Sequence, residues 1–103
     1  MTSKHYSKKR NARERFINKH INGDGNVIDS FEVDRHHKDG KEIHSITDTG
    51  LIIIYNKNTG KLVTKLIARP QQIIRYYKNC DKDPPDYLLK LAEWHMSLYY
   101  NVR

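Results

Sequence analysis

The stretch that decides the fold is residues 41–77, which read KEIHSITDTGLIIIYNKNTGKLVTKLIARPQQIIRYY. Within it, residues 51–55 are the longest apolar run of the chain, and Gly50 and Gly60 mark the turns on either side. A short continuous apolar run between turns is typical of a central strand that is covered on both faces. Glycine suits the turns because it adopts positive φ without steric cost. The pattern predicts a helix after three strands, which are expected over residues 42–48, 51–55 and 61–68.

The segments on either side of this stretch complete the predicted fold. Residues 27–34 alternate between apolar and polar side chains, which predicts a half-buried strand. The basic segment from about Lys4 to His20 has the apolar spacing of a helix, and Pro70 is suited to the first position of another helix. A last helix is expected over residues 84–100, with Asp83 as its N-cap. Runs of one kind of element predict an α+β fold, with an N-terminal helix, a four-stranded antiparallel sheet and two C-terminal helices.

The length and the cysteine count set bounds on the class of protein. A chain of 103 residues has the size of one domain, so we expect a single domain over residues 1–103. Residues 1–10 are a basic N-terminal segment that can be flexible, and residues 82–103 are a C-terminal helical extension. The single cysteine, Cys80, excludes an internal disulfide framework and fits the cytosol. No apolar run reaches the ~20 residues of a transmembrane helix, and the apolar region of a signal peptide is absent. The sequence predicts a cytoplasmic protein without membrane contact.

Basic residues exceed acidic ones, and this points to a polyanionic partner. The formal net charge is +7 and the isoelectric point is about 9.6. A basic domain attracts polyanions, of which nucleic acid is the commonest. The predicted contacts are Lys8, Lys9, Arg10, Arg13, Lys65 and Arg75. The alternative for the N-terminal helix is a surface helix whose charges are only solvated.

Tyrosines lie among these basic residues, as in the segment Arg75-Tyr76-Tyr77-Lys78. Aromatic rings can stack on unpaired bases, which favours RNA over DNA as the partner. The alternative is that these tyrosines are packing residues. No metal or cofactor is expected, because His36 and His37 are adjacent and point to opposite sides of an extended segment.

Glu42 and His44 are the strongest chemical signal in the sequence. Their spacing of two residues on a predicted strand puts a carboxylate and an imidazole on one face, roughly 6–7 Å apart. Such a pair suits general acid–base catalysis near neutral pH. The alternative is structural, with Glu42 in a cross-strand ion pair with Lys65 and His44 partly buried.

The strand predicted over residues 61–68 carries Thr64 and Lys65, and Arg69 follows its end. A lysine or an arginine there can hold a phosphate and stabilise charge on its oxygens. Cleavage of RNA needs a base for the 2′-hydroxyl, an acid for the leaving oxygen and a cation on the phosphate. The candidate catalytic residues are therefore His44, Glu42, Thr64 and Arg69.

The segments EIHSIT, LIIIYN and TGKLVTKLIARP, after a basic helix and a first strand, resemble the metal-independent ribonuclease fold. This fold is shared by barnase, EndoU, colicin and RelE-type toxins, and the resemblance covers roughly residues 13–69. It implies RNA cleavage with His44, Thr64, Arg69 and Glu42 at the active positions. Two features depart from the group. Its members often carry an active histidine in the first helix, where this chain has only His20 near the end. The fold also typically ends at the last strand, whereas this chain continues into helices.

Three functions follow from the sequence. The first is a small RNA-cleaving toxin of a bacterial mobile element or phage, whose protein partner would be an antitoxin. The second is a non-catalytic phage- or plasmid-encoded inhibitor, similar in role to an anti-CRISPR, that binds a host nucleoprotein defence complex or its nucleic acid. The third is a DNA-binding regulator, although no helix-turn-helix partner follows the N-terminal helix. Whether the chain is an enzyme stays open at this point.

Overall fold

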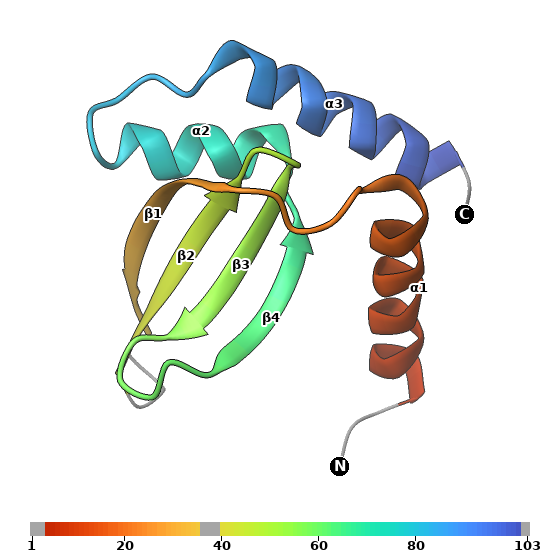
Figure 1. The fold of residues 1–103 in the computed structure, drawn as a ribbon, viewed down its shortest axis with the longest axis horizontal. Coiled ribbons are helices and arrows are strands. Elements are labelled where there is room, and N and C mark those ends of the chain that lie inside the picture. Colours follow the sequence, from red (N-terminus) through yellow and green to blue (C-terminus); the bar gives the residue numbers. More distant parts are fainter. Residues whose placement is uncertain (1–3, 36–39, 102–103) are drawn as a thin grey trace.

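Three helices and four strands make up the described part of the chain (Figure 1). The computed structural model describes residues 4–35 and 40–101, and the side chains within 11–35 and 40–100. The predicted α+β order is confirmed, while the adjacent pair His36 and His37 lies outside the described residues. The elements are α1 (Lys4–His20), β1 (Val27–Asp34), β2 (Lys41–Thr47), β3 (Leu51–Asn56), β4 (Leu62–Ile67), α2 (Pro70–Lys78) and α3 (Asp86–Asn101).

The strands form one antiparallel sheet in the order β1-β2-β3-β4. The predicted central position of the apolar run is confirmed, because β3 lies between β2 and β4. The register places Phe31 opposite His44, His44 opposite Ile54, and Ile54 opposite Thr64. Directly opposed residues of antiparallel strands share a face. These side chains therefore form one row across the sheet, on the face that α2 covers.

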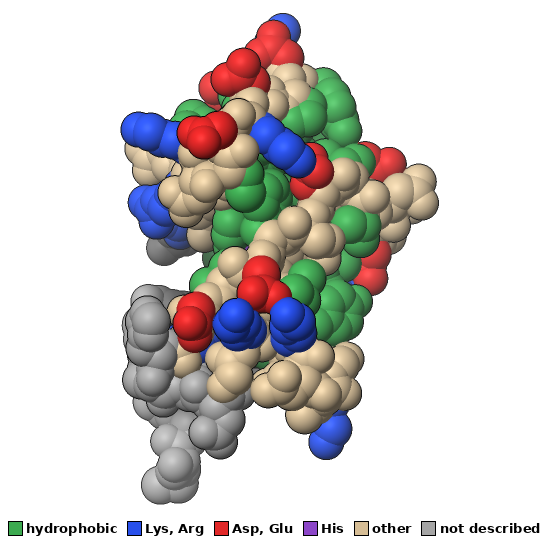
Figure 2. Space-filling model, turned by 90° about the vertical axis from the view of Figure 1, so that its left-hand side faces the viewer, with side chains coloured by type: hydrophobic (Ala, Val, Ile, Leu, Met, Phe, Trp, Pro, Cys, Tyr) green, Lys and Arg blue, Asp and Glu red, His purple; other side chains and the backbone are tan. Residues whose placement is uncertain are grey.

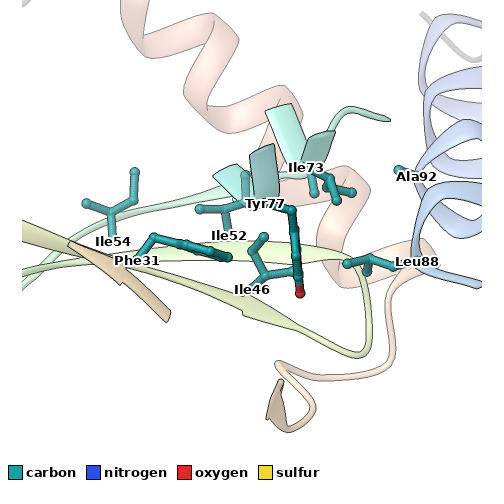
Figure 3. Packing of buried hydrophobic residues seen from close by; sticks show 9 residues of the cluster. Phe31, Ile46, Ile52, Ile54, Ile73, Tyr77, Leu88 and Ala92 are labelled. Carbon is teal, nitrogen blue, oxygen red and sulfur yellow. The ribbon is translucent and has the colours of Figure 1, made fainter. Parts of the chain in front are cut away.

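The main core lies between this face and the two C-terminal helices (Figure 3). Ile73 and Tyr77 of α2 pack toward the sheet, where they meet Ile46 and Ile52. From α3, the residues Leu88 and Ala92 are completely buried in the same cluster. The C-terminal helical extension is thus part of the core that holds the sheet and α2 together.

A second, smaller cluster lies on the other face of the sheet. α1 stands beside β4, while α2 and α3 lie across one end of the sheet (Figure 1). The buried members of the cluster are Phe16, Ile21, Leu51, Ile53 and Ile67. The predicted apolar stripe of the N-terminal helix therefore packs against the strands and against the end of α3.

No helix in the described part of the chain is long and apolar enough to cross a membrane.

The predicted start of the last helix is wrong by two residues. The helix begins at Asp86 rather than at Pro84. Pro84 precedes another proline, and the residue before a proline is disfavoured in the α conformation. The carbonyl of Pro85 accepts the first hydrogen bond of this turn, from the N–H of Leu88 over 3.1 Å. Asp83 therefore lies outside the helix that it was expected to cap.

Candidate functional site

Glu42 and His44 lie side by side on β2, as their spacing predicts. His44 Nε2 is 3.0 Å from Glu42 Oε1. Both residues are buried, with 7% of Glu42 and 6% of His44 exposed. The other ring nitrogen, Nδ1, has a short hydrogen bond to the hydroxyl of Tyr76 on α2. The imidazole is therefore held at both nitrogens between a carboxylate and a phenol.

The partners of His44 determine which of its nitrogens carries the proton. A carboxylate accepts hydrogen bonds only, so Nε2–H donates to Glu42 and Nδ1 accepts from the Tyr76 O–H. Burial raises the pKa of the Tyr76 hydroxyl above its ordinary value, the charge of Glu42 raises it further, and Arg75 opposes both. Tyr76 is therefore protonated at neutral pH. The result is a directed hydrogen-bond chain from Tyr76 through His44 to Glu42, which we call the relay.

Neighbouring side chains fix the relay in place. The ring of Phe31 on β1 stacks on Tyr76 with ring centroids 5.2 Å apart and planes 21° apart. The rings of His44 and Tyr76 meet edge to face at 5.6 Å. Arg35, just after β1, lies with Nη1 3.6 Å from Glu42 Oε1. This packing restricts the motion of all three relay residues, as pre-organised acid–base groups require.

A cavity opens beside the relay, and we call it the relay pocket. Its volume is about 310 Å³. His44 and Tyr76 line it together with Phe31, Glu32, Val33, Gln72, Arg75, Asn79 and Cys80. The carboxylate of Glu32 is paired with Lys41 and Lys57. Arg75 adds a positive charge that can bind a phosphate. The pocket thus combines a proton-transfer chain with an anion-binding group, in a space large enough for part of a nucleotide.

Sequence reasoning missed the role of Tyr76. It considered the segment around Tyr76 for stacking on bases or for packing, and not as a partner of His44. The sequence offered one signal, the position of Tyr76 on a helix that follows the sheet. Its partner His44 lies 32 residues earlier in the chain, so local spacing does not relate the two. Tyr76 is next to the buried Tyr77 in the sequence, but only the packing of α2 against β2 shows that Tyr76 contacts His44.

Thr64 does not adjoin His44. It shares the row across the sheet, but Ile54 lies between them, and two strand spacings separate their backbones by about 10 Å. The hydroxyl of Thr64 instead accepts a hydrogen bond from Nη2 of Arg13 on α1, over 3.2 Å. The structure therefore places the hydroxyl of Thr64 beside a basic side chain of α1 rather than beside His44.

Lys65 and Arg69 also lie away from the relay. Lys65 is on the opposite face, as the register pairs it with Ile53 and through Ile53 with Ser45. Its Nζ lies 2.7 Å from Asp24 Oδ2, so the alternative of a Glu42–Lys65 ion pair is wrong. Arg69 is exposed at the N-cap of α2. It lines a different cavity, of about 330 Å³, together with Arg13.

The remaining predicted basic contacts are only partly placed by the structure. Lys8, Lys9 and Arg10 belong to α1, but their side chains are outside the described part. On the side where β1 forms the edge of the sheet, basic and acidic side chains are interspersed (Figure 2). One reason is Glu32, which pairs with Lys57 and, over 3.2 Å, with Lys41. Among the predicted contacts whose side chains are described, Arg13, Lys65 and Arg75 each line a pocket.

Within residues 4–35 and 40–101, no three His, Cys, Asp or Glu side chains lie close enough together to hold a metal ion.

Comparison with family models, with curated proteins and with solved structures gives no match in any of the three. The resemblance to metal-independent ribonucleases therefore stays an expectation, and function has to be argued from the relay and its pocket.

Proposed function

We propose that this protein cleaves single-stranded RNA and that the relay is its proton-transfer device. The observation that carries the proposal is the hydrogen-bond chain Tyr76–His44–Glu42, which ends at a pocket containing Arg75. A buried carboxylate behind an imidazole stabilises the imidazolium that forms when the imidazole accepts a proton. The phenol at the front of the chain is the group that substrate can reach.

In the proposed reaction the 2′-oxygen of a ribose attacks the adjacent phosphorus. Its proton passes to the Tyr76 oxygen as the Tyr76 proton moves to His44 Nδ1, and Glu42 stabilises the resulting imidazolium. The bond from phosphorus to the 5′-oxygen breaks, and that oxygen takes a proton from water. The hydroxide that remains takes a proton from Tyr76 as the His44 imidazolium returns its proton to Tyr76, which restores the relay. The products are a 2′,3′-cyclic phosphate and a free 5′-hydroxyl.

Arg75 would stabilise the negative charge that develops on the phosphate oxygens. An arginine suits this task because its planar guanidinium donates two parallel hydrogen bonds to a phosphate. DNA cannot react in this way because it lacks the 2′-hydroxyl nucleophile. The division of labour differs from the sequence expectation, since Arg75 takes the role that was expected for Arg69 and Tyr76 stands between His44 and the substrate.

The test is cleavage of single-stranded RNA by purified protein in EDTA, with the Tyr76→Phe variant beside it. Loss of the phenol proton should lower the rate by ~10²-fold or more, the scale of one acid–base group. Tyr87→Phe is the matched control, because Tyr87 is 52% exposed and is not among the relay residues. It should cleave at the wild-type rate. Equal rates for the Tyr76→Phe and wild-type proteins, or cleavage of DNA at the same rate, would refute the proposal.

A non-catalytic role is the second candidate, and the pocket between Arg13 and Arg69 favours it. In this role the protein would bind RNA, or the nucleic acid of a host nucleoprotein defence complex, without cutting it. Absence of cleavage combined with tight RNA binding would support this candidate. Expression in a bacterial host adds a further distinction, because a toxin-like ribonuclease should arrest growth unless an antitoxin is present.

A further inference from the structure

A second pocket lies where all three helices meet the end of β4, and we call it the two-arginine pocket. Its volume is about 330 Å³. Arg13 enters it from α1 and Arg69 from the start of α2, while Met96, Tyr99 and Tyr100 come from α3. Two arginines that line one small cavity suit an anionic ligand, because nothing acidic is among its lining residues.

This pocket and the relay pocket are neighbours along one flank of α2. Gln72 lines both cavities. Arg69, Gln72, Tyr76 and Asn79 follow one another at intervals of three and four residues, so they share one side of the helix. From Arg69 to Asn79 this flank is about 15 Å long, at 1.5 Å per residue. A short single strand that occupies one pocket can therefore extend into the other.

The arginines in the two-arginine pocket are set up to bind phosphate. Thr64 holds the guanidinium of Arg13 through its hydroxyl, 3.2 Å from Nη2. The remaining N–H groups of Arg13 keep the fork geometry that pairs with phosphate oxygens. Arg69 is exposed beside it. Thr64 thus acts as a positioning residue for Arg13.

The tyrosines offer a surface for a base. The ring of Tyr99 packs edge to face on Phe16, with centroids 5.2 Å apart. Tyr100 meets Tyr99 at 5.8 Å and is 53% exposed. Bases of single-stranded nucleic acid stack on such rings without regard to sequence. A nucleotide subsite needs arginines for the phosphate and an aromatic ring for the base. The exposed ring of Tyr100, which contacts the anchored ring of Tyr99, can serve for the base.

We propose that the two-arginine pocket binds a nucleotide of the RNA strand that neighbours the cleaved phosphodiester. Arg13 and Arg69 hold its phosphate, and Tyr100 stacks on its base. This inference rests on the proposed RNA-cleaving function, because it names where the rest of that substrate lies. The subsite requires only phosphate and base, so it should accept a DNA strand that cannot be cleaved.

The experiment measures fluorescence anisotropy of a labelled oligodeoxyuridine of ~8 nucleotides. Wild type is compared with Arg13→Gln/Arg69→Gln and with the charge-matched control Lys61→Gln/Lys90→Gln, whose residues are exposed and line neither pocket. The Arg13/Arg69 variant should bind at least tenfold more weakly, and its slope of log K against log salt should be shallower by about 1.4. The control should stay within about threefold of wild type, by screening of distant charges. Tyr100→Leu should weaken binding about tenfold.

Two outcomes overturn the subsite: wild type fails to bind the oligodeoxyuridine, or the Arg13/Arg69 variant binds as tightly as the control. If circular dichroism shows that the double variant is unfolded, the oligodeoxyuridine affinities of the single variants Arg69→Gln and Lys90→Gln are compared instead. Arg69 is exposed, so its replacement should not disturb the fold. This assay involves no cleavage. Failure of the relay in the RNA assay would therefore leave the binding result standing, and loss of the subsite would leave the relay result standing.

Discussion

Arg13 of α1 donates a hydrogen bond to the hydroxyl of Thr64 on β4, across 3.2 Å and 51 residues of sequence. The contact ties the N-terminal helix to the edge of the sheet. Arg13 lines both the two-arginine pocket and the cavity between α1 and β4. Thr64, which was predicted for catalysis, therefore contacts Arg13, which was predicted for nucleic-acid binding.

The first prediction concerns the hydroxyl of Thr64. Thr64→Val keeps the shape of the side chain but removes the acceptor for Arg13, so the guanidinium loses its fixed position. We expect the affinity for the oligodeoxyuridine to fall about fivefold, which corresponds to ~1 kcal/mol, the net value of one hydrogen bond. Thr64→Ser retains the hydroxyl and should bind as wild type does. Identical affinities of the valine and serine variants would show that Thr64 does not position Arg13.

The second prediction concerns the carboxylate of Glu42. In Glu42→Gln the amide carries no charge, so it cannot stabilise an imidazolium at His44. The amide N–H₂ can also donate to Nε2, and this favours the tautomer that no longer accepts a proton from Tyr76. We expect kcat for RNA cleavage to fall ~10²-fold while KM and oligodeoxyuridine affinity stay unchanged. Glu93→Gln, at an exposed position of α3, is the control and should retain full activity.

An unchanged kcat for Glu42→Gln would remove Glu42 from the relay. A loss of both kcat and affinity, with altered near-ultraviolet circular dichroism, would instead indicate that the buried Glu42–His44 pair only maintains the packing of β2 against α2.

Local patterns predicted the parts of this protein that depend on neighbouring residues. The apolar run at residues 51–55 identified β3 as a central strand, because a strand needs that many apolar side chains only when both faces are covered. The spacing of Glu42 and His44 put them on one face because side chains alternate along a strand. Both conclusions follow from the chain itself, without knowledge of any distant contact.

The arrangement across the sheet could not be predicted in the same way. Whether Thr64 or Lys65 shares a face with His44 depends on strand register, which changes face with a shift of one residue. The register of β4 shifts between Ile54 and Tyr55 of its partner strand, and no residue pattern marks that irregularity. Tyr76 joins the relay through the crossing of α2 over β2, which is a property of the packed core.

The third prediction concerns stability and the hydroxyl of Tyr77. The ring is buried at the centre of the main core, and its O–H donates a short hydrogen bond to Asp29 on β1. Burial raises the pKa of this hydroxyl and the neighbouring carboxylate raises it further, so it remains a donor at all ordinary pH values. Tyr77→Phe should lower the free energy of unfolding by about 2 kcal/mol, as for a hydrogen bond to a charged group.

Urea denaturation measures this change, with Tyr87→Phe as the exposed control. Since 1 kcal/mol shifts the melting temperature of a domain of this size by roughly 4–8 °C, thermal melts should show the same loss as a decrease of about 10 °C. Equal stability of Tyr77→Phe and wild type would mean that water replaces the hydroxyl as the partner of Asp29.

The last prediction is a pH dependence of stability that originates at His95. Its side chain is 4% exposed and packs edge to face on Phe16 of α1, with ring centroids 6.2 Å apart. Its Nδ1 has no hydrogen-bond partner among the described residues. Burial lowers the pKa of His95 below its ordinary value of 6.5, and the charge of the nearby His20 lowers it further.

The direction of the effect follows from proton binding. Below about pH 6.5 the unfolded chain protonates this histidine while the folded protein does not, so the unfolded state binds more protons and stability falls with falling pH. The full contribution of His95 is present above pH 6.5 and is lost as the pH falls toward the lowered pKa of the folded state. One proton accounts for a slope of at most about 1.4 kcal/mol per pH unit. Urea denaturation at a series of pH values below 6.5 should therefore give a shallower decline for His95→Leu than for wild type. Parallel declines would assign the pH dependence to groups other than His95.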